Sequence, residues 1–222
     1  SSNKIQDISI LNKKKIQRLY LSFNKIEDYS TITELKQLQR LDLSFNKITD
    51  VCFLQNLKQL EWLDLGCNEL TQLDLDTFSF LQDIKLYGNP LQYISLKNIP
   101  NLQSLNLSHL KLNFIELINL SKLQNLNAEN NFIRNFNLEN LPNLYNLNLR
   151  SNKIQMVSTL DQLQVLKYLD LSFNEIQDIF ALQNLKHLLF LNLNNNKIIS
   201  CNWDNLTSLL KFTLCQNPLK EI

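Results

Sequence analysis

Hydrophobic residues recur along the chain at intervals of 21 or 22 residues. Residues 38–46 read LQRLDLSFN, and residues 166–174 read LKYLDLSFN. The shared pattern is LxxLxLxxN, in which L is an aliphatic residue. It begins at Ile16, Leu38, Leu60, Leu81, Leu102, Leu123, Leu144, Leu166, Leu188 and Leu209. The chain is therefore predicted to be a tandem array of about ten similar units.

Each unit predicts one short strand. In the LxL part, the two aliphatic side chains point to the same side of an extended chain, and the residue between them points to the other side. A single unit cannot bury its apolar residues alone, so its neighbours must cover them. We therefore expect the strands to stack as one parallel sheet on the inner side of a solenoid.

An asparagine closes almost every unit. These residues are Asn24, Asn46, Asn68, Asn89, Asn131, Asn152, Asn174, Asn196 and Asn217. Leu110 stands where one Asn is missing, and Asn3 matches them in an earlier, partial unit. A side-chain amide both donates and accepts hydrogen bonds, so it can satisfy backbone groups where the chain leaves the strand. The repeated asparagines are predicted to be structural and not catalytic.

The outer half of the units comes in two kinds. Units of 22 residues have apolar residues three apart, as in Ile48, Val51 and Leu54, which favours a helical or 3₁₀ turn. Units of 21 residues have two apolar residues two apart, which indicates a short extended strand. The 21-residue examples are Leu73 and Leu75, Ile94 and Leu96, Ile115 and Leu117, Phe136 and Leu138, and Cys201 and Trp203.

The phrase LDLSFN followed by KI or EI resembles the leucine-rich repeats of protein phosphatase 1 regulators, and axonemal dynein light chains and tubulin-cofactor repeats are similar. The residues that carry this resemblance are 24–26, 46–48, 152–154 and 174–176. The 21-residue units look more like a shorter class that is frequent in microbial proteins. The resemblance implies an α/β solenoid, a leucine-rich-repeat horseshoe. Its parallel sheet lies on the concave face, with short strands and 3₁₀ or helical turns on the convex face.

The resemblance covers residues 1–222 as one repeat domain. Residues 217–219, Asn-Pro-Leu, resemble the last unit before a capping helix in the regulator-type proteins. No polar cap follows them. Repeat arrays need polar end caps, so we expect the chain to be part of a longer one or to have its ends covered by partners.

Composition argues against several functions. The chain has 22 Lys and Arg against 21 Asp and Glu, and its longest basic run is Lys13 to Lys15, which does not favour nucleic-acid binding. No apolar stretch approaches the roughly 18 residues that a membrane span needs. With two histidines and two glycines, Gly66 and Gly88, the sequence offers no metal-binding, cofactor-binding or nucleophile motif. We expect no enzymatic activity.

Four scattered cysteines, Cys52, Cys67, Cys201 and Cys215, form no close pair. Free thiols in a reducing compartment are the simplest interpretation, so the expected location is cytoplasmic, including cytoskeletal or ciliary. Three glycosylation motifs begin at Asn106, Asn119 and Asn205, a number that chance predicts in a sequence so rich in Asn.

Exposed positions on the predicted strands give the candidate binding surface. Trp, Tyr and Arg dominate protein interfaces. The candidate partner-binding residues are Arg18, Tyr20, Arg40, Trp62, Tyr87, Tyr168 and Phe190. With the neighbouring phenylalanines they form two aromatic clusters, the first being Arg18, Tyr20, Phe23, Arg40, Phe45 and Trp62 and the second Tyr168, Phe173 and Phe190. Between these clusters lies a stretch rich in Asn, Ser and Gln. Phe23, Phe45 and Phe173 share the LSFN position and are interpreted as covering the edge of the sheet.

These observations predict a protein-binding module, acting as a regulatory or scaffold subunit on whose concave face a partner lies. A cell-surface domain that binds peptide or carbohydrate is a second hypothesis. A structural spacer inside a large assembly, for example an axonemal one, is a third.

Overall fold

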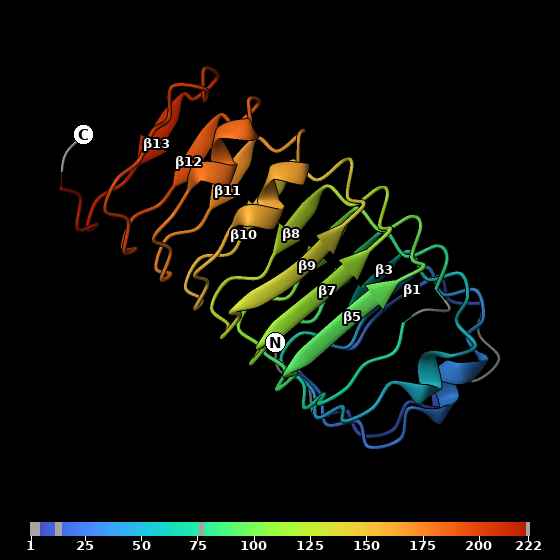
Figure 1. Ribbon diagram of the computed structural model, residues 1–222. Helices are drawn as coiled ribbons and strands as arrows, with labels where there is room; N and C mark the ends of the chain where they lie inside the picture. Colours follow the sequence, from blue (N-terminus) through green and yellow to red (C-terminus); the bar gives the residue numbers. More distant parts are fainter. Residues whose placement is uncertain (1–4, 12–14, 76–77, 221–222) are drawn as a thin grey trace.

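A computed structural model describes residues 5–11, 15–75 and 78–220 of the chain. Asn3, Lys13 and Lys14, which the sequence singled out, lie outside the described residues. The chain winds as a solenoid whose successive turns stack from one end of the molecule to the other (Figure 1). No described helix is both long enough and apolar enough to cross a membrane.

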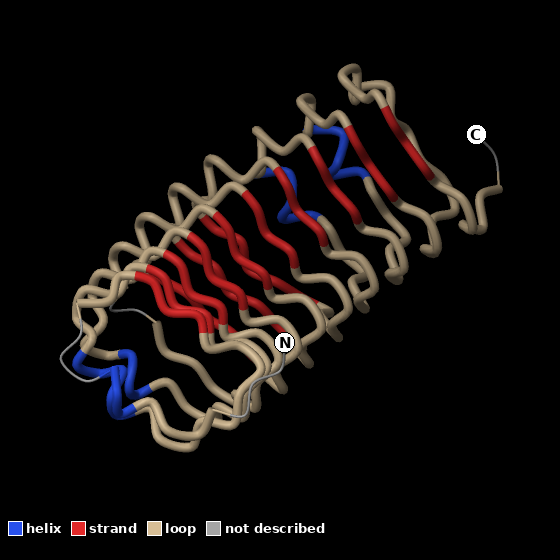
Figure 2. Tube along the Cα trace, turned by 180° about the vertical axis from the view of Figure 1, so that it is seen from behind, coloured by secondary structure: helices blue, strands red, loops and turns tan. Residues whose placement is uncertain are grey.

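Ten short parallel strands line one side of the solenoid, and Figure 2 shows them in a row from behind. In spatial order they are β1 (Arg18–Tyr20), β2 (Arg40–Asp42), β3 (Trp62–Asp64), β4 (Asp83–Lys85), β6 (Ser104–Asn106), β8 (Asn125–Asn127), β10 (Asn146–Asn148), β11 (Tyr168–Asp170), β12 (Phe190–Asn192) and β13 (Lys211–Thr213). Each strand pairs in register with the same three positions of the next unit, as Leu19 does with Leu41. The predicted concave sheet is confirmed.

One continuous core fills the solenoid. The aliphatic residues of the repeat, such as Leu41, Leu43, Leu63 and Leu65, are fully buried, because the units on both sides cover them. The side chains between the paired leucines point to the concave surface, as strand geometry requires. The core therefore uses one face of each strand and leaves the other face for contact with solvent or a partner.

The asparagines at the unit ends form a buried hydrogen-bonded ladder, as predicted. The Asn152 side-chain Nδ2 donates to the carbonyls of Leu149 and Ala128, each at 3.0 Å. Its Oδ1 accepts from the backbone N–H of Ile133, also at 3.0 Å. These bonds tie one unit to the next. Asn46 differs, because its Nδ2 donates normally but its buried Oδ1 has no hydrogen-bond partner among the described residues.

The convex side follows unit length as predicted, with three exceptions. The four 22-residue units contain the 3₁₀ helices η2 (Ser30–Glu34), η3 (Cys52–Leu54), η4 (Ser158–Gln162) and η5 (Phe180–Asn184). Three 21-residue units contain β5 (Tyr93–Lys97), β7 (Phe114–Ile118) and β9 (Asn135–Glu139), which pair as a second parallel sheet. This sheet is in front in Figure 1.

The exceptions concern the remaining 21-residue units. The first contains the 3₁₀ helix η1 (Ser9–Leu11), with Ile8 buried and Ile10 exposed. Residues 73–75 and 201–203 form no strand in the described part of the chain, so the strand prediction is wrong for both. Residues 201–203 follow the unit with η5, which offers no strand to pair with. Residues 73–75 lie between the units with η3 and β5, and nothing in the structure explains why they do not extend the β5 sheet.

A second row of asparagines, which the sequence did not reveal as one, follows the convex strands. Asn98, Asn119 and Asn140 all have a left-handed backbone, with φ of 61°, 58° and 54°. Asn tolerates this conformation better than most residues. Asn140 Nδ2 also donates to Asn119 Oδ1 at 2.8 Å. Here again the repeated asparagine closes a turn.

Candidate functional site on the concave face

Most side chains in the middle of the concave strands serve the fold. Asn127 Oδ1 accepts a hydrogen bond from the backbone N–H of Glu129 at 3.1 Å, an Asx turn that leads the chain out of the strand. The same bond to the residue two positions on is made by Asp42, Asp64, Asn106, Asn148, Asp170 and Asn192. The sequence predicted the outward strand positions as a candidate binding surface and did not predict this turn-closing role. The recurrence of Asp or Asn inside LxL was the signal of its structural role.

Tyr20 and Lys85 interrupt this column at the N-terminal end. Neither side chain can accept the turn-closing hydrogen bond in the way that a carboxylate or an amide oxygen does. Tyr20 is 57% exposed, and Lys85 lies with its ammonium 5.0 Å from the ring centroid of Trp62. In these two units the residue between the paired aliphatic residues therefore does not close the turn after its strand, as Asp or Asn does at the positions named above.

The N-terminal candidates lie side by side, as the sequence predicted. Arg18 pairs with Arg40 in the strand register, and Arg40 pairs with Trp62. Tyr20 stands on the same strand face as Arg18 and opposite Asp42. Arg18, Tyr20 and Arg40 are exposed, and Trp62 is half-buried. We call Arg18, Tyr20, Arg40 and Trp62 the N-terminal cluster.

Acidic side chains border the N-terminal cluster. Burial raises the pKa of Asp64, and the nearby carboxylates of Asp42 and Asp83 raise it further, although the N–H of Gly66 and the ammonium of Lys85 oppose them. Burial likewise raises the pKa of Asp83, against the lowering effect of Lys85, of Arg40 and of side-chain hydrogen bonds with Trp62 and Ser104. Within the described residues, the buried Oδ1 of Asp83 accepts no hydrogen bond. This part of the face holds charges and an acceptor that the fold does not fully satisfy.

The middle of the face, in contrast, is uncharged along its strands and internally bonded. Asn146 Nδ2 donates to Asn125 Oδ1 at 3.3 Å, and Asn125 Nδ2 donates to the hydroxyl of Tyr145 at 3.3 Å. Asn148 Nδ2 donates to Glu129 at 3.0 Å. We call strands β6, β8 and β10 the central floor. Its amides are largely engaged with one another and with the turns.

A second aromatic pair lies at the C-terminal end of the face. Tyr168 of β11 is directly opposite Phe190 of β12 in the register, and the ammonium of Lys211 lies 5.3 Å from the Phe190 ring centroid. A shallow hollow of about 290 Å³ is lined by Asn146, Leu147, Asn148, Tyr168, Leu169, Asp170 and Phe190. The structure thus brings Tyr168 and Phe190 together as predicted, several strands from the N-terminal cluster.

Tyr87 does not belong to either cluster. It follows β4 and lies on the flank where the strands end. A Cβ at Gly66 would be 2.3 Å from the Tyr87 ring, so a residue larger than glycine would collide with it. The ring also contacts Phe45 edge-on, with centroids 6.4 Å apart. Gly66 therefore makes room for an aromatic side chain outside the concave columns.

Phe23, Phe45 and Phe173 occupy left-handed backbone positions, with φ of 56°, 54° and 57°. Phe23 and Phe45 stack with ring centroids 4.0 Å apart, so they do pack against each other. Even so, Phe23 is 48% and Phe45 39% exposed. Bulky residues are rare in this conformation, which costs L-residues roughly 1–2 kcal/mol. Parts of these rings therefore remain uncovered, at a backbone position that is unfavourable for a bulky side chain.

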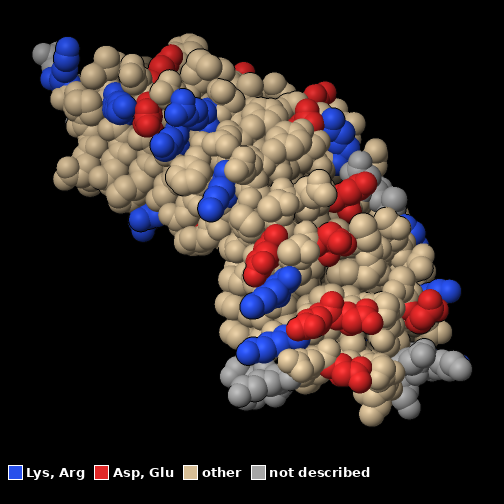
Figure 3. Space-filling view, turned by 90° about the horizontal axis from the view of Figure 1, so that it is seen from below, with Lys and Arg blue, Asp and Glu red and all other residues tan. Residues whose placement is uncertain are grey.

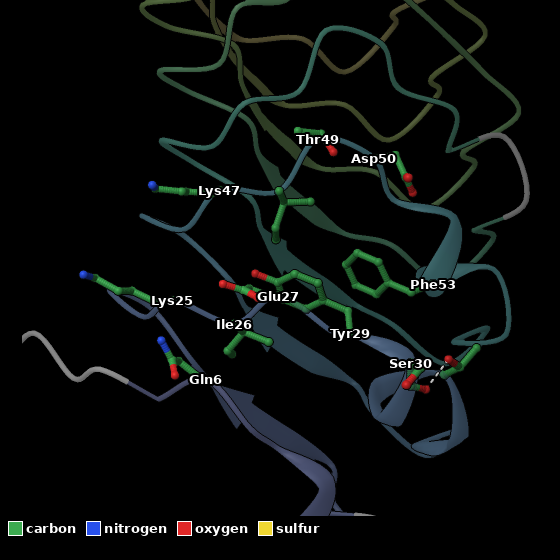
Figure 4. Close-up of a pocket in the computed structure, with 12 residues that line it drawn as sticks. Gln6, Lys25, Ile26, Glu27, Tyr29, Ser30, Lys47, Thr49, Asp50 and Phe53 are labelled. Carbon is green, nitrogen blue, oxygen red and sulfur yellow. Dashed lines mark hydrogen bonds between the residues drawn. The ribbon is translucent and has the colours of Figure 1, made fainter.

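A hollow of about 680 Å³ lies beside the first two complete units (Figure 4). Tyr29 and Phe53 stack within it, with centroids 4.9 Å apart. Burial raises the pKa of Tyr29 to about 12, and its buried hydroxyl has no hydrogen-bond partner in the described part of the structure. Lys25 and Lys47 extend away from this aromatic pair, both toward the same side (Figure 4).

Neither the thiols with shifted pKa values nor the potential metal ligands of the described residues form a reactive arrangement. Burial raises the pKa of the Cys67 and Cys201 thiols, and a hydrogen bond with Asp50 raises that of Cys52, so these thiols are poor nucleophiles at neutral pH. Across the described residues, no three His, Cys, Asp or Glu side chains are placed to hold a metal ion. On the face shown in Figure 3, Lys and Arg predominate at the upper left, and most of the Asp and Glu lie at the lower right among other Lys and Arg.

Comparison with known families agrees with this geometry. The family model described as leucine-rich repeat matches residues 142–198, and the one described as leucine-rich repeats in two copies matches residues 36–79. The chain carries leucine-rich repeats. No curated protein matches it in sequence.

Several solved leucine-rich-repeat structures are similar. An internalin, inlF, from Listeria monocytogenes is 25% identical with a TM-score of 0.70, over 97% of this chain and 72% of that one. The leucine-rich-repeat domain of APL1B is 23% identical with a TM-score of 0.83, over 97% of this chain and 66% of that one. The LRIM1/APL1C complex contains a chain that is 26% identical with a TM-score of 0.75, over 83% of this chain and 36% of that one.

This chain thus spans between about a third and three quarters of the length of these structures. Leucine-rich-repeat domains generally bind proteins through their extended concave surfaces and are typically not enzymes. The concave face is therefore the candidate binding surface of this fold.

Proposed function

We propose that this chain binds a protein partner along its concave sheet and acts as a regulatory or scaffold subunit. The observation that carries the proposal is the contrast within that sheet. Side chains of the central floor are engaged in turns and amide contacts, whereas Arg18, Tyr20 and Arg40 extend from neighbouring strands without such a role. Exposed Arg and Tyr beside a half-buried Trp are the residues that usually dominate protein interfaces.

The C-terminal pair supplies a second contact in this proposal. Tyr168 and Phe190 border a hollow large enough for a side chain of the partner. Parallel strands lie about 4.8 Å apart, and five strand spacings separate β3 from β11, so roughly 24 Å lies between the two sites. An extended protein segment of about seven residues covers that distance. The Asn-Lys-Ile phrases at residues 24–26 and 46–48 support the regulator-type part of the proposal.

The test uses a tagged chain to isolate the partner from the native source, followed by calorimetric titration of the purified pair. The double substitution Arg40→Ala with Trp62→Ala should weaken binding by about 2 kcal/mol or more, which is roughly 30-fold in Kd. Tyr168→Ala with Phe190→Ala should weaken it to a smaller extent. Circular dichroism should be unchanged, because most of these side chains leave the surface of the sheet.

Lys111→Ala with Lys153→Ala provides the matched control, since both lysines are exposed on turns beside the asparagine ladder. Loss of binding in this control pair alone would place the partner off the concave face and would refute the proposal.

We also propose a reducing compartment, such as the cytoplasm, for this function. Cys52, Cys67, Cys201 and Cys215 are all unpaired thiols, which supports it. Labelling of the protein from its native source without reductant should modify the accessible thiols Cys52 and Cys215. Paired cysteines, or glycans at Asn119 or Asn205, would instead favour a cell-surface recognition domain.

A further inference from the structure

The residue just before each ladder asparagine has a left-handed backbone in every complete unit. In several units that residue is one that tolerates the conformation, namely Gly88, Asn130 and Asn195. The other units have Phe23, Phe45, Cys67, His109, Ser151, Phe173 and Gln216 there, and the three phenylalanines are the large apolar residues among them. Strained positions of this kind cluster at binding sites, where the side chain has a use that offsets the strain.

The rings of Phe23 and Phe45 are not buried in the core. Phe23 and Phe45 stack on one another with an interplanar angle of 9°, and large parts of both remain exposed. Tyr87 extends the row, because Gly66 lets its ring approach Phe45. We call Phe23, Phe45 and Tyr87 the aromatic strip. It runs along the flank where β1, β2 and β4 end.

Basic side chains lie on both sides of the aromatic strip. Arg18 and Arg40 are exposed on the concave side, and Lys25 and Lys47 are exposed just past the asparagines. In the described part of the chain none of the four belongs to an ion pair, although Arg40 is close enough to Asp83 to influence its pKa. The carboxylate of Asp42, the nearest acid on β2, accepts hydrogen bonds from Ser44. Cations therefore lie on both sides of Phe23 and Phe45, whereas the carboxylates of Asp64 and Asp42 lie near Tyr87, where they help burial to raise the pKa of its hydroxyl.

We infer that the aromatic strip is a docking surface for an acidic segment of the protein partner that also carries aromatic or aliphatic side chains. Its apolar side chains lie against Phe23, Phe45 and Tyr87, and its carboxylates meet the cations on either side. This inference rests on the proposed function, since it names a second part of the partner that the concave face holds. Aromatic side chains bracketed by cations fit such a segment better than a neutral or basic one.

The test exploits the backbone at the two phenylalanines. Asn suits a left-handed position better than Phe, so Phe23→Asn with Phe45→Asn should leave the melting temperature at or above that of the wild type. If the rings serve the fold instead, the melting temperature of this variant falls. Phe173→Asn is the matched control, because it occupies the same position and its ring already lies against Arg150, 4.4 Å from the centroid.

The binding probe is a displayed library of random 12-residue peptides, selected on the wild-type chain. We expect the selected peptides to combine Asp or Glu with Phe, Leu or Ile. Their affinity should fall at least tenfold for Phe23→Asn with Phe45→Asn, and should not change for Phe173→Asn. Lys25→Gln with Lys47→Gln should weaken binding and reduce its dependence on salt.

In the experiments with peptides and with thermal unfolding, three results overturn the inference. The first is selection of peptides without acidic residues, or of no peptides. The second is equal binding by wild type and the Phe23→Asn, Phe45→Asn variant. The third is a lowered melting temperature of that variant.

The same variants separate this inference from the proposed function. If the native partner is lost on Arg40→Ala with Trp62→Ala but not on the strip variant, the concave function stands and the strip is not used. If the acidic peptides need the strip while the partner ignores the concave pair, the strip stands and the concave function fails.

Discussion

The N-terminal cluster and the central floor share one sheet and one backbone geometry, yet their side chains behave differently. In the central floor, Asn106, Asn127 and Asn148 each close the turn after their own strand. In the N-terminal region, Tyr20 and Lys85 replace the turn-closing residue, and charged side chains are only partly compensated. A repeated residue in a solenoid thus points to a structural role, and a departure from the repeat points to function.

The largest expected loss of stability follows from substituting a repeated asparagine of the buried ladder. Asn152→Ala removes three donated hydrogen bonds and one accepted hydrogen bond, which should lower the free energy of unfolding by about 1–3 kcal/mol. Urea unfolding midpoints measure this. Asn46→Ala should cost less, because the Oδ1 of Asn46 has no partner to lose. Equal stability of wild type and Asn152→Ala would remove the argument that the ladder stabilises the fold.

Substitutions on the concave surface should have smaller effects on stability, and the loss should be greater in the central floor than in the N-terminal cluster. Asn127→Ala leaves the N–H of Glu129 without its acceptor and should cost about 1 kcal/mol. Tyr20→Ala removes an exposed ring and should change stability by no more than about 0.5 kcal/mol. Thermal unfolding of both variants under the same conditions gives the comparison. If Tyr20→Ala is the more destabilising change, the N-terminal cluster is structural as well.

The smallest effect is expected from pH. The pKa of Asp64 is raised in the folded chain, so the folded state binds more protons than the unfolded state above the ordinary Asp pKa of about 3.8. Stability contributed by this group therefore falls as pH rises through the raised pKa. Asp64→Asn, which retains an acceptor for Gly66, should raise the unfolding midpoint at pH 7 and lose this advantage below about pH 3.8.

Asp28 should change the pH dependence of stability in the opposite direction to Asp64, so it serves as the control. A hydrogen bond from the N–H of Ser30 lowers its pKa, so its stabilising effect is present at neutral pH and lost as pH falls through the lowered pKa. Asp28→Asn should lower the midpoint at pH 7. A pH profile that is the same for both variants would contradict these assignments.

Much of the fold could be predicted because the same pattern of buried and exposed positions recurs in every unit. Paired leucines predicted the concave strands, and unit length predicted 3₁₀ helices in all four 22-residue units. Extended segments at residues 73–75 and 201–203 were predicted but form no strand; the unit before residues 201–203 has a 3₁₀ helix and offers no strand to pair with, whereas residues 73–75 adjoin β5 and still form none. The candidate residues Arg18, Arg40 and Trp62 were correctly expected to be neighbours, because parallel register follows from the repeat.

The sequence by itself determined the periodic part of this protein: which leucines enter the core, which asparagines bridge units, and which columns face outward. These features depend on spacing along the chain, which is readable directly. Only the tertiary structure decided how single side chains in those columns are used. Whether an outward Asp or Asn is free depends on hydrogen bonds to a turn, and whether a Phe is strained depends on its backbone angle. The position of Tyr87 outside the N-terminal cluster likewise depends on packing, because Gly66 of the neighbouring unit leaves room for the Tyr87 ring on the flank.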